Sequence, residues 1–183
     1  MHSKLRQMIQ KIALSLCLSM LSMTYVQAQQ VGTAVTDDID QYKQINAPIP
    51  AFSMETADGH FHSEKDIPAK AAVVVLFNPT CDHCQDLAKD IVKHKEEFEA
   101  IPLVFIAAKD MKPYLEDFIK ATGLKQLPHA MVGADRSDVI YQLYEFKALP
   151  QTNVYTEKHT LKYKHNGSVS TKELLSVISG KGK

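Results

Sequence analysis

The chain has 183 residues, of which 45% are hydrophobic, and it carries 21 basic and 21 acidic residues. This length suits one globular domain with a sizeable core, and the composition excludes a fibrous or largely disordered chain. The balanced charge gives no indication of binding to nucleic acid or to an anionic membrane.

Residues 1–28 differ from the rest of the chain. Basic residues near the N-terminus precede a mostly apolar stretch at residues 12–26, and Val26-Gln27-Ala28 has the small-residue pattern of a cleavage site. We interpret this segment as a secretory signal peptide that is cleaved after Ala28, which predicts a periplasmic or otherwise exported protein. An uncleaved membrane anchor is the less favoured alternative, because serine and threonine interrupt a stretch shorter than the ~20 apolar residues of a span.

The remaining chain is expected to form one domain. Residues 29–47 are interpreted as a polar linker, residues 48–179 as the folded domain and residues 180–183 as a disordered tail. Cys17 would leave with the signal peptide, so the mature chain would keep two cysteines, both between residues 81 and 84. In an exported protein a disulfide between them can persist.

The domain begins with signals for a hairpin and a buried strand. Short extended runs at residues 51–54 and 60–62 flank Thr56-Ala-Asp-Gly59, and an Asp-Gly pair between such runs is typical of a β-hairpin. Residues 71–77 are apolar throughout and rich in β-branched side chains. This pattern predicts a strand that is covered on both faces of a parallel or mixed sheet.

Alternating helical and strand signals follow. Residues 85–98 repeat apolar side chains at the spacing of one helical face, and residues 101–107 predict a second buried strand. Residues 114–122 predict a helix that ends at Gly123, a residue suited to the left-handed conformation of a C-terminal cap.

The last third of the domain predicts four shorter elements and a final helix. A short strand at residues 130–132 precedes a helix around residues 137–143, and residues 152–156 and 160–164 alternate as paired strands do. Ser170-Thr-Lys-Glu173 is a capping-box pattern ahead of an amphipathic stretch. The order predicts an α/β domain with a central mixed sheet flanked by helices.

Cys81-Asp-His-Cys84 lies between the first buried strand and the helix that follows it. Two cysteines at this spacing can form and open a disulfide, and the start of a helix stabilises a thiolate, which is the attacking species. Cys81 and Cys84 are therefore the predicted catalytic residues. His83 is expected to favour the Cys81 thiolate and Asp82 to oppose it, which predicts an intermediate reduction potential.

A structural disulfide and a metal site are the less favoured interpretations of these residues. A disulfide across two residues constrains the unfolded chain little, so a purely structural role is disfavoured. A zinc site needs about four ligands, and only His60, His62 and His83 offer themselves besides the thiols, so metal binding is disfavoured. His60 and His62 are expected on the surface of the hairpin, and we expect no bound metal or other cofactor.

The order of elements, the two-cysteine motif and Leu149-Pro150 before a strand resemble the thioredoxin fold. Within that fold the chain resembles exported TlpA-like thiol-disulfide oxidoreductases over residues 48–178. The resemblance implies an N-terminal β-hairpin and an inserted strand-helix piece, assigned to residues 127–143. It also implies that Pro150, with Leu149, lies beside the cysteines as a cis-proline and binds an extended substrate peptide.

Two positions depart from the family pattern. The buried acid that thioredoxins carry on the strand before the motif falls at Val75, and the glutamate of many TlpA-like reductases falls at Leu87. The group that accepts the Cys84 proton is therefore unassigned, and a role in cytochrome c maturation is less favoured.

The predicted function is exchange of the Cys81–Cys84 disulfide with protein thiols or disulfides, together with a redox partner that resets the pair. A copper-binding chaperone or assembly factor is the first alternative, because soft thiolates suit Cu(I). A peroxiredoxin-like thiol peroxidase is a weaker alternative, since Pro79-Thr80-Cys81 lacks the spacing of the peroxide-binding pattern. No nucleic-acid partner and no membrane span after cleavage are expected.

Overall fold

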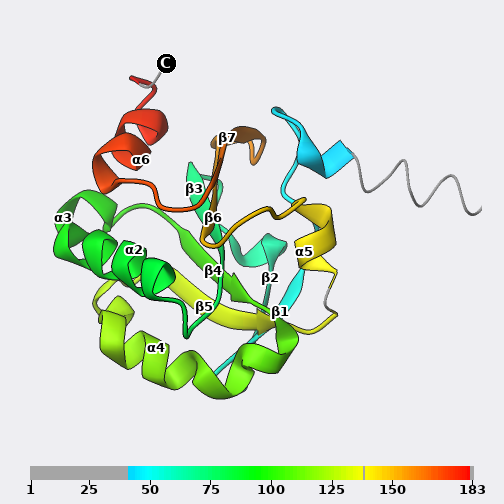
Figure 1. Cartoon of the computed structure of the whole chain (residues 1–183). Helices are drawn as coiled ribbons and strands as arrows, with labels where there is room; N and C mark the ends of the chain where they lie inside the picture. The colour runs from blue at the N-terminus through cyan, green and yellow to red at the C-terminus, as the bar shows by residue number, and fades with distance from the viewer. Residues whose placement is uncertain (1–40, 138, 182–183) are drawn as a thin grey trace, which may run out of the picture. The chain divides into compact units, whose positions relative to one another are not determined.

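The computed structural model describes residues 41–137 and 139–181, and the predicted signal peptide and most of the predicted linker lie outside them. The described chain forms a seven-stranded mixed sheet in the order β2-β1-β5-β4-β3-β6-β7 (Figure 1). The strands are β1 (Ser53–Thr56), β2 (Phe61–Ser63), β3 (Ala72–Phe77), β4 (Leu103–Ala107), β5 (Ala130–Asp135), β6 (Gln151–Tyr155) and β7 (Leu161–Asn166).

Helices cover both faces of this sheet. The α-helices are α2 (Asp82–Lys93), α3 (Lys95–Phe98), α4 (Leu115–Thr122), α5 (Ile140–Leu143) and α6 (Thr171–Ile178). Short 3-10 turns lie at η1 (Gln41–Lys43), η2 (Glu64–Asp66), η3 (Lys109–Tyr114) and η4 (Leu124–Gln126). Buried side chains of α2, α4 and α6 share one core cluster, whereas α5 contributes to the cluster on the other face. The predicted α/β class with a mixed sheet is confirmed.

The two central strands explain why residues 71–77 and 101–107 are apolar throughout. All six residues of β3 and all five of β4 are buried. Val73, Val75 and Phe77 face the cluster under α2 and α4, and the alternate residues Val74 and Leu76 face the opposite cluster. A strand with helices or loops on both faces has no side that needs polar residues.

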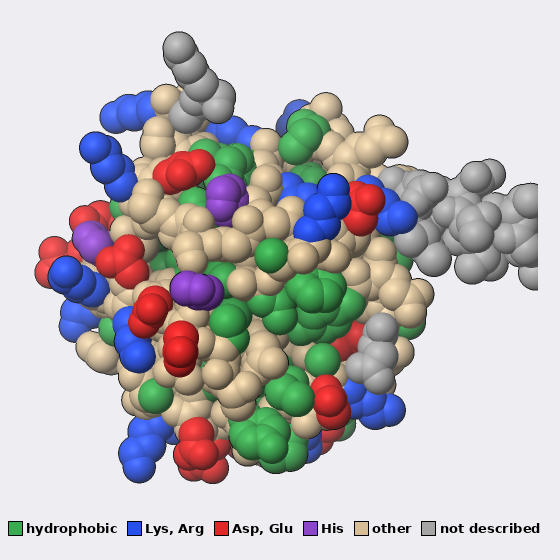
Figure 2. All heavy atoms as spheres, viewed as in Figure 1, with side chains coloured by type: hydrophobic (Ala, Val, Ile, Leu, Met, Phe, Trp, Pro, Cys, Tyr) green, Lys and Arg blue, Asp and Glu red, His purple; other side chains and the backbone are tan. Residues whose placement is uncertain are grey.

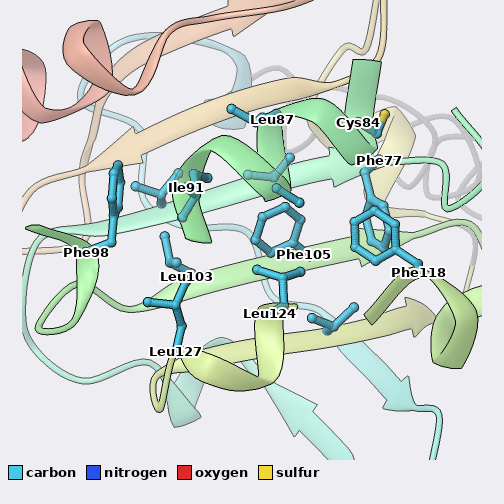
Figure 3. Close-up of a cluster of buried hydrophobic side chains, with 14 of the residues drawn as sticks. Phe77, Cys84, Leu87, Ile91, Phe98, Leu103, Phe105, Phe118, Leu124 and Leu127 are labelled. Carbon is cyan, nitrogen blue, oxygen red and sulfur yellow. The ribbon is translucent and has the colours of Figure 1, made fainter. Parts of the chain in front are cut away.

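The core beneath α2 extends from Phe98 at one end to Phe77 and Cys84 at the other (Figure 3). The Phe77 ring lies 4.5 Å from the Phe118 ring and 5.7 Å from the Phe105 ring, measured between centroids. The buried cysteine of the motif is therefore packed at the edge of an aromatic cluster.

Several local predictions agree with the structure. The hairpin joins β1 to β2 through Gly59 at φ +86°, and Gly123 ends α4 in the left-handed conformation at φ +76°. Ser170 caps α6 by accepting a hydrogen bond from the Glu173 N–H at 3.2 Å. The reciprocal half of the predicted capping box is replaced, because the Glu173 carboxylate accepts a hydrogen bond from the Tyr163 hydroxyl at 2.7 Å instead.

Two predicted helices differ from the observed ones. The helix expected at residues 85–98 begins earlier, at Asp82, and is interrupted at His94, whose Nδ1 lies 2.8 Å from the Asp90 carbonyl oxygen. A side chain that engages a helical carbonyl competes with the backbone at that turn. The helix expected around residues 137–143 is one turn, Ile140–Leu143.

The inserted strand-helix piece widens the sheet. β5 pairs in parallel with β4 and antiparallel with β1, so it joins the N-terminal hairpin to the central strands. After β5, the Asp135 carboxylate accepts hydrogen bonds from the Ile140 N–H and the Ser137 hydroxyl, each at 3.2 Å. These bonds hold Ser137 and the first residue of α5 to the end of β5.

The end of the predicted linker, which lies within the described residues, pairs with the backbone of β7. The Asn46 N–H donates to the Leu161 carbonyl, and the Leu161 N–H donates to the Ala47 carbonyl, both at 2.7 Å. Among residues 41–137 and 139–181, no helix combines the length and the apolar character that crossing a bilayer requires.

Candidate redox site

The two cysteines lie at the junction of β3 and α2, as the sequence predicts. Cys81 is the N-cap residue of α2, and the Cys84 N–H donates a hydrogen bond of 3.1 Å to the Cys81 carbonyl. Both side chains are free thiols, with Cys81 partly exposed and Cys84 1% exposed. One thiol is thus accessible at a helix N-terminus, and the other lies one turn later in the core.

The loop before Cys81 is held by two amide side chains that sequence reasoning missed. The Asn78 side-chain oxygen accepts hydrogen bonds from the Thr80 N–H and the Thr80 hydroxyl, each at 2.9 Å. The Gln85 side-chain nitrogen donates to the Pro79 carbonyl at 3.0 Å. An Asn two residues before a Thr is the signal of an Asx turn that could have identified the first of them.

Cys84 is held in its neutral form. Burial raises the pKa of the Cys84 thiol to about 12. A hydrogen bond from the Asn78 backbone N–H acts in the opposite direction, and the neighbouring Cys81 side chain raises the pKa further. Because the thiolate is the reacting species, Cys84 needs a neighbouring group or a reaction partner to help it lose its proton.

Asp82 and His83 occupy the first turn of α2 between the two thiols. Both side chains are exposed. They can act on Cys81 through their charge across partly solvated space, where such effects are moderate. Their predicted opposing influence on the Cys81 thiolate stays a prediction.

The two positions that lack the family's acids are apolar and lie in the same cluster as Cys84. Val75 is fully buried on β3, and Leu87 is 5% exposed on α2. Val75 pairs across the sheet with Thr152, whose hydroxyl oxygen is buried and has no hydrogen-bond partner within the described chain. The site therefore carries a neutral hydroxyl on the strand beside the position of the missing acid.

Pro150 lies at the same end of the sheet as the motif. Gln151 of β6 pairs with Leu76 of β3, so Pro150, one residue earlier, lies alongside Phe77. The Leu149–Pro150 peptide bond is cis, which is the isomer that the family resemblance implies. The Pro150 carbonyl accepts a hydrogen bond from the Gly167 N–H at 2.8 Å, and Leu149 packs against both core clusters.

Tyr141 is a further residue of this region that the sequence did not indicate. Its hydroxyl donates a hydrogen bond of 2.9 Å to the carbonyl of Phe77, the last residue of β3. Burial raises the pKa of Tyr141 well above its ordinary value, and the charge of a Cys84 thiolate would raise it further. The inserted helix α5 therefore contacts the strand end that carries the motif.

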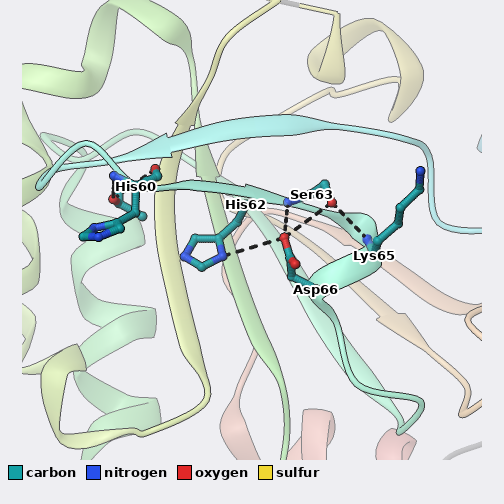
Figure 4. A network of polar contacts seen from close by, with 6 residues as sticks. His60, His62, Ser63, Lys65 and Asp66 are labelled. Carbon is teal, nitrogen blue, oxygen red and sulfur yellow. Dashed lines mark hydrogen bonds and ion pairs between the residues drawn. The ribbon is translucent and has the colours of Figure 1, made fainter.

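The histidines of the hairpin form separate surface contacts. His60 lies 3.2 Å from Asp58. His62 lies 3.8 Å from Asp66, as Figure 4 shows. Asp66 also accepts a hydrogen bond of 2.7 Å from the Ser63 N–H as part of the cap of η2. Throughout the part of the chain that the structure describes, no three His, Cys, Asp or Glu side chains converge as a metal site.

Figure 2 shows one face of the molecule, on which hydrophobic side chains gather in a patch near the centre and charged side chains lie mainly towards the edge. Large hydrophobic side chains of the described chain that are exposed include Ile45, Phe61, Tyr114, Val139 and Phe146. The Phe146 ring packs edge-on against the Tyr141 ring at 5.4 Å between centroids.

Comparison with solved structures identifies the fold. A secreted Mycobacterium tuberculosis disulfide oxidoreductase homologous to E. coli DsbE is similar with a TM-score of 0.60 and 20% identity, over 70% of this chain and 95% of that chain. A DsbF homologue from Corynebacterium diphtheriae gives a TM-score of 0.61 and 21% identity, over 73% of this chain and 86% of that chain. A thioredoxin family thiol:disulfide interchange protein from Chlorobium tepidum gives a TM-score of 0.60 and 18% identity, over 75% of this chain and 97% of that chain. At these identities the likeness establishes a thioredoxin-like fold.

Sequence comparison identifies the family. No curated protein sequence matches the chain. The AhpC/TSA family matches residues 45–164, which span the hairpin, the cysteine motif, Pro150 and the first part of β7. The match and the structural neighbours confirm the resemblance to TlpA-like thiol-disulfide oxidoreductases that the motif and the element order indicate. The chain belongs to the AhpC/TSA family of thioredoxin-fold proteins.

Proposed function

We propose that this protein is an exported thiol-disulfide oxidoreductase that exchanges the Cys81–Cys84 disulfide with protein thiols or disulfides. The observation that carries the proposal is the difference in exposure between two thiols on one helical turn, Cys81 at the N-cap and Cys84 1% exposed. The family match and the disulfide oxidoreductases among the structural neighbours support the same class of chemistry.

In the reducing direction the Cys81 thiolate attacks one sulfur of a client disulfide, and the other client sulfur leaves as a thiolate. The Cys84 thiolate then attacks the Cys81 sulfur, the Cys81–Cys84 bond forms, and the second client sulfur leaves. The client gains two electrons and, after protonation, two hydrogens, while the pair is oxidised. A thiol-containing partner restores the dithiol, and the reverse path oxidises a client.

The backbone near Pro150 supplies a place for the client chain. Pro150 lies alongside Phe77 at the sheet end that carries the motif, and it has no backbone N–H. An extended client segment can pair with backbone groups beside it while its sulfur approaches Cys81. Leu149, partly buried beside Pro150, would contact that segment.

Reduction of insulin by dithiothreitol tests the proposal. The wild-type chain should accelerate precipitation of the insulin B chain, and Cys81→Ser should abolish the acceleration. In the full, uncleaved chain Cys17→Ser is the matched control, because it makes the same chemical change outside the motif and should retain activity. Equal activity of wild type and Cys81→Ser would exclude the proposed role of Cys81.

Copper binding is the competing hypothesis for the same two thiols. It requires both sulfurs as thiolates on one ion, whereas burial raises the pKa of Cys84 to about 12. Titration of the reduced chain with Cu(I) separates the two functions. Tight binding that is lost in both Cys81→Ser and Cys84→Ser, without insulin reduction, would favour the copper function.

A further inference from the structure

Tyr141 connects the inserted helix to the strand that carries the motif. Asp135, 1% exposed at the end of β5, accepts hydrogen bonds from the Ser137 hydroxyl and the Ile140 N–H and so fixes the residue before Tyr141. The Tyr141 hydroxyl then reaches Phe77, 64 residues earlier in the chain, at 2.9 Å. The direction of the phenol is determined at both ends, by the helix start and by this hydrogen bond.

The phenol takes the place of a ladder hydrogen bond between β3 and β4. Val73 pairs with Leu103, and its N–H donates to the carbonyl of Pro102, the residue before its partner. In this parallel pattern the N–H of Ala108 would donate to the carbonyl of Phe77, one rung beyond the last pair. Instead, the Tyr141 hydroxyl donates to the carbonyl of Phe77, and the Ala108 backbone acts on the phenol by lowering its pKa against the larger effect of burial.

The same peptide group faces Cys84. The carbonyl of Phe77 and the N–H of Asn78 belong to one planar peptide unit. Tyr141 binds the oxygen of this unit at 2.9 Å, and the Asn78 N–H lowers the pKa of the Cys84 thiol against the larger effect of burial. Phe77 and Cys84 also lie side by side in one core cluster (Figure 3). A hydrogen bond accepted by a peptide carbonyl polarises the unit and strengthens its N–H as a donor.

We propose that Tyr141 is a positioning residue for Cys84: through the Phe77–Asn78 peptide its hydroxyl orients and strengthens the N–H that stabilises the Cys84 thiolate. The inference rests on the proposed function, in which Cys84 must attack as a thiolate. The inference gives α5, the helix of the inserted strand-helix piece, a role in the redox site. Val75 and Leu87 occupy the positions of the family's acids there and have apolar side chains.

Few charged or titratable groups of the described residues act on Cys84 or Tyr141. Cys81 acts on Cys84 from the N-cap of α2, while Asp110 and Asp135 act on Tyr141 from η3 and the end of β5. Because burial raises the pKa of Tyr141, the phenol remains a neutral donor at neutral pH. Tyr141 thus supplies a hydrogen bond and does not itself take the Cys84 proton.

Two-step reaction with 5,5′-dithiobis(2-nitrobenzoate) tests the proposal in the full chain carrying Cys17→Ser. Attack by Cys81 releases one thionitrobenzoate and leaves a mixed disulfide, and attack by Cys84 on Cys81 releases the second. Tyr141→Phe removes the hydroxyl and keeps the ring. Tyr114→Phe, at a tyrosine that is 48% exposed, is the matched control.

We expect Tyr141→Phe to slow the second release about two- to fourfold at pH 7 and to leave the first release unchanged. A rise of the Cys84 pKa by half a unit to one unit lowers the thiolate fraction by up to about tenfold, and the greater nucleophilicity of the thiolate offsets part of that loss. Tyr114→Phe should match the parent chain in both steps. An unchanged second step, or equal slowing of both steps, would overturn the proposal.

A second measurement separates this inference from the proposed function. If the parent chain released no second thionitrobenzoate, the proposed exchange reaction would fail, but Tyr141 could still be tested in the Cys17→Ser, Cys81→Ser chain. There, Tyr141→Phe should slow the reaction of Cys84 with methyl methanethiosulfonate about two- to fourfold between pH 8 and pH 10. Equal rates with and without the Tyr141 hydroxyl would refute its action on Cys84.

Discussion

The Cys84 N–H donates a hydrogen bond of 3.1 Å to the carbonyl of Cys81, so the two thiols share the first turn of α2. Cys81 is partly exposed at the N-cap, and Cys84 is 1% exposed beside Phe77 and Leu87. A client protein can therefore reach the Cys81 thiol. The Cys84 thiol, one helical turn later, is accessible only to Cys81 or to a group bound to Cys81.

Alkylation should be selective for Cys81. In the reduced chain at pH 7, iodoacetamide should modify Cys81 first, because Cys81 is partly exposed, whereas Cys84 is 1% exposed and burial raises its pKa to about 12. Peptide mapping by mass spectrometry locates the label. In 6 M urea, with the burial removed, both cysteines should react at similar rates. Equal labelling of the two thiols in the folded chain would contradict the assigned roles.

The stability of the reduced protein should fall at alkaline pH because of Cys84. Its pKa rises from an ordinary 9.0 to about 12 on folding. Between these values the unfolded chain loses the proton and the folded chain keeps it, so the free energy of unfolding falls as pH rises, by at most about 1.4 kcal/mol per pH unit. This contribution is complete below pH 9 and is lost towards pH 12.

Urea unfolding at pH 8, 9 and 10 measures this loss, with Cys84→Ala as the comparison. Buried tyrosines such as Tyr144 and Tyr155, whose pKa values are also raised by burial, contribute equally to both chains. Above pH 9 the wild type should lose stability more steeply than Cys84→Ala. Parallel pH profiles would show that Cys84 titrates alike in the folded and unfolded chains.

Asn78→Ala should loosen the motif loop. It removes the side-chain oxygen that accepts hydrogen bonds from the Thr80 N–H and hydroxyl. We expect a loss of about 0.5–2 kcal/mol in the free energy of unfolding, as for other side-chain caps of backbone N–H groups. Asn78→Asp keeps the acceptor and should recover most of the stability. No difference between Asn78→Ala and Asn78→Asp in urea unfolding would dismiss the Asx turn as a source of stability.

In the core beneath the motif, Phe118→Ala should lower the free energy of unfolding more than Phe118→Leu does. Phe118 is 1% exposed, and its ring lies 4.5 Å from Phe77 and 6.2 Å from Phe105. Truncation should cost about 3–5 kcal/mol, whereas Phe118→Leu should cost less because it leaves a smaller cavity. Phe61→Ala, at a ring that is 58% exposed, is the control and should cost under about 1 kcal/mol. Thermal or urea unfolding of the three variants measures these losses of stability. A different order would contradict the prediction.

The sequence predicts those parts of the fold that depend on local residue patterns or on the composition of a segment. β3 and β4 are apolar throughout because both faces are covered, and the Asp-Gly pair and Gly123 adopt the positive φ angles that glycine allows. The motif was recognisable because its spacing and its place before a helix have one dominant chemical meaning. The family pattern located Pro150, although no local signal distinguishes it from another turn proline.

The parts that could not be predicted depend on contacts between distant segments. Tyr141 reaches Phe77 only because Asp135 folds the β5–α5 connection back over the sheet, and no periodicity records that docking. The break at His94 depends on where one ring nitrogen lies. The family pattern predicts an acid as the group that accepts the Cys84 proton, whereas the structure packs that thiol among the apolar side chains of one core cluster.

The reduction potential of the Cys81–Cys84 pair distinguishes a pair that exchanges with client proteins from a structural disulfide. The full chain with Cys17→Ser would be equilibrated in glutathione buffers of stepped ratio, quenched, and analysed by mass for the disulfide. We expect one two-electron transition with a midpoint between about −120 and −270 mV, the range from strong oxidants to thioredoxin. A disulfide that never forms, or one that persists below about −300 mV as structural disulfides do, would contradict it.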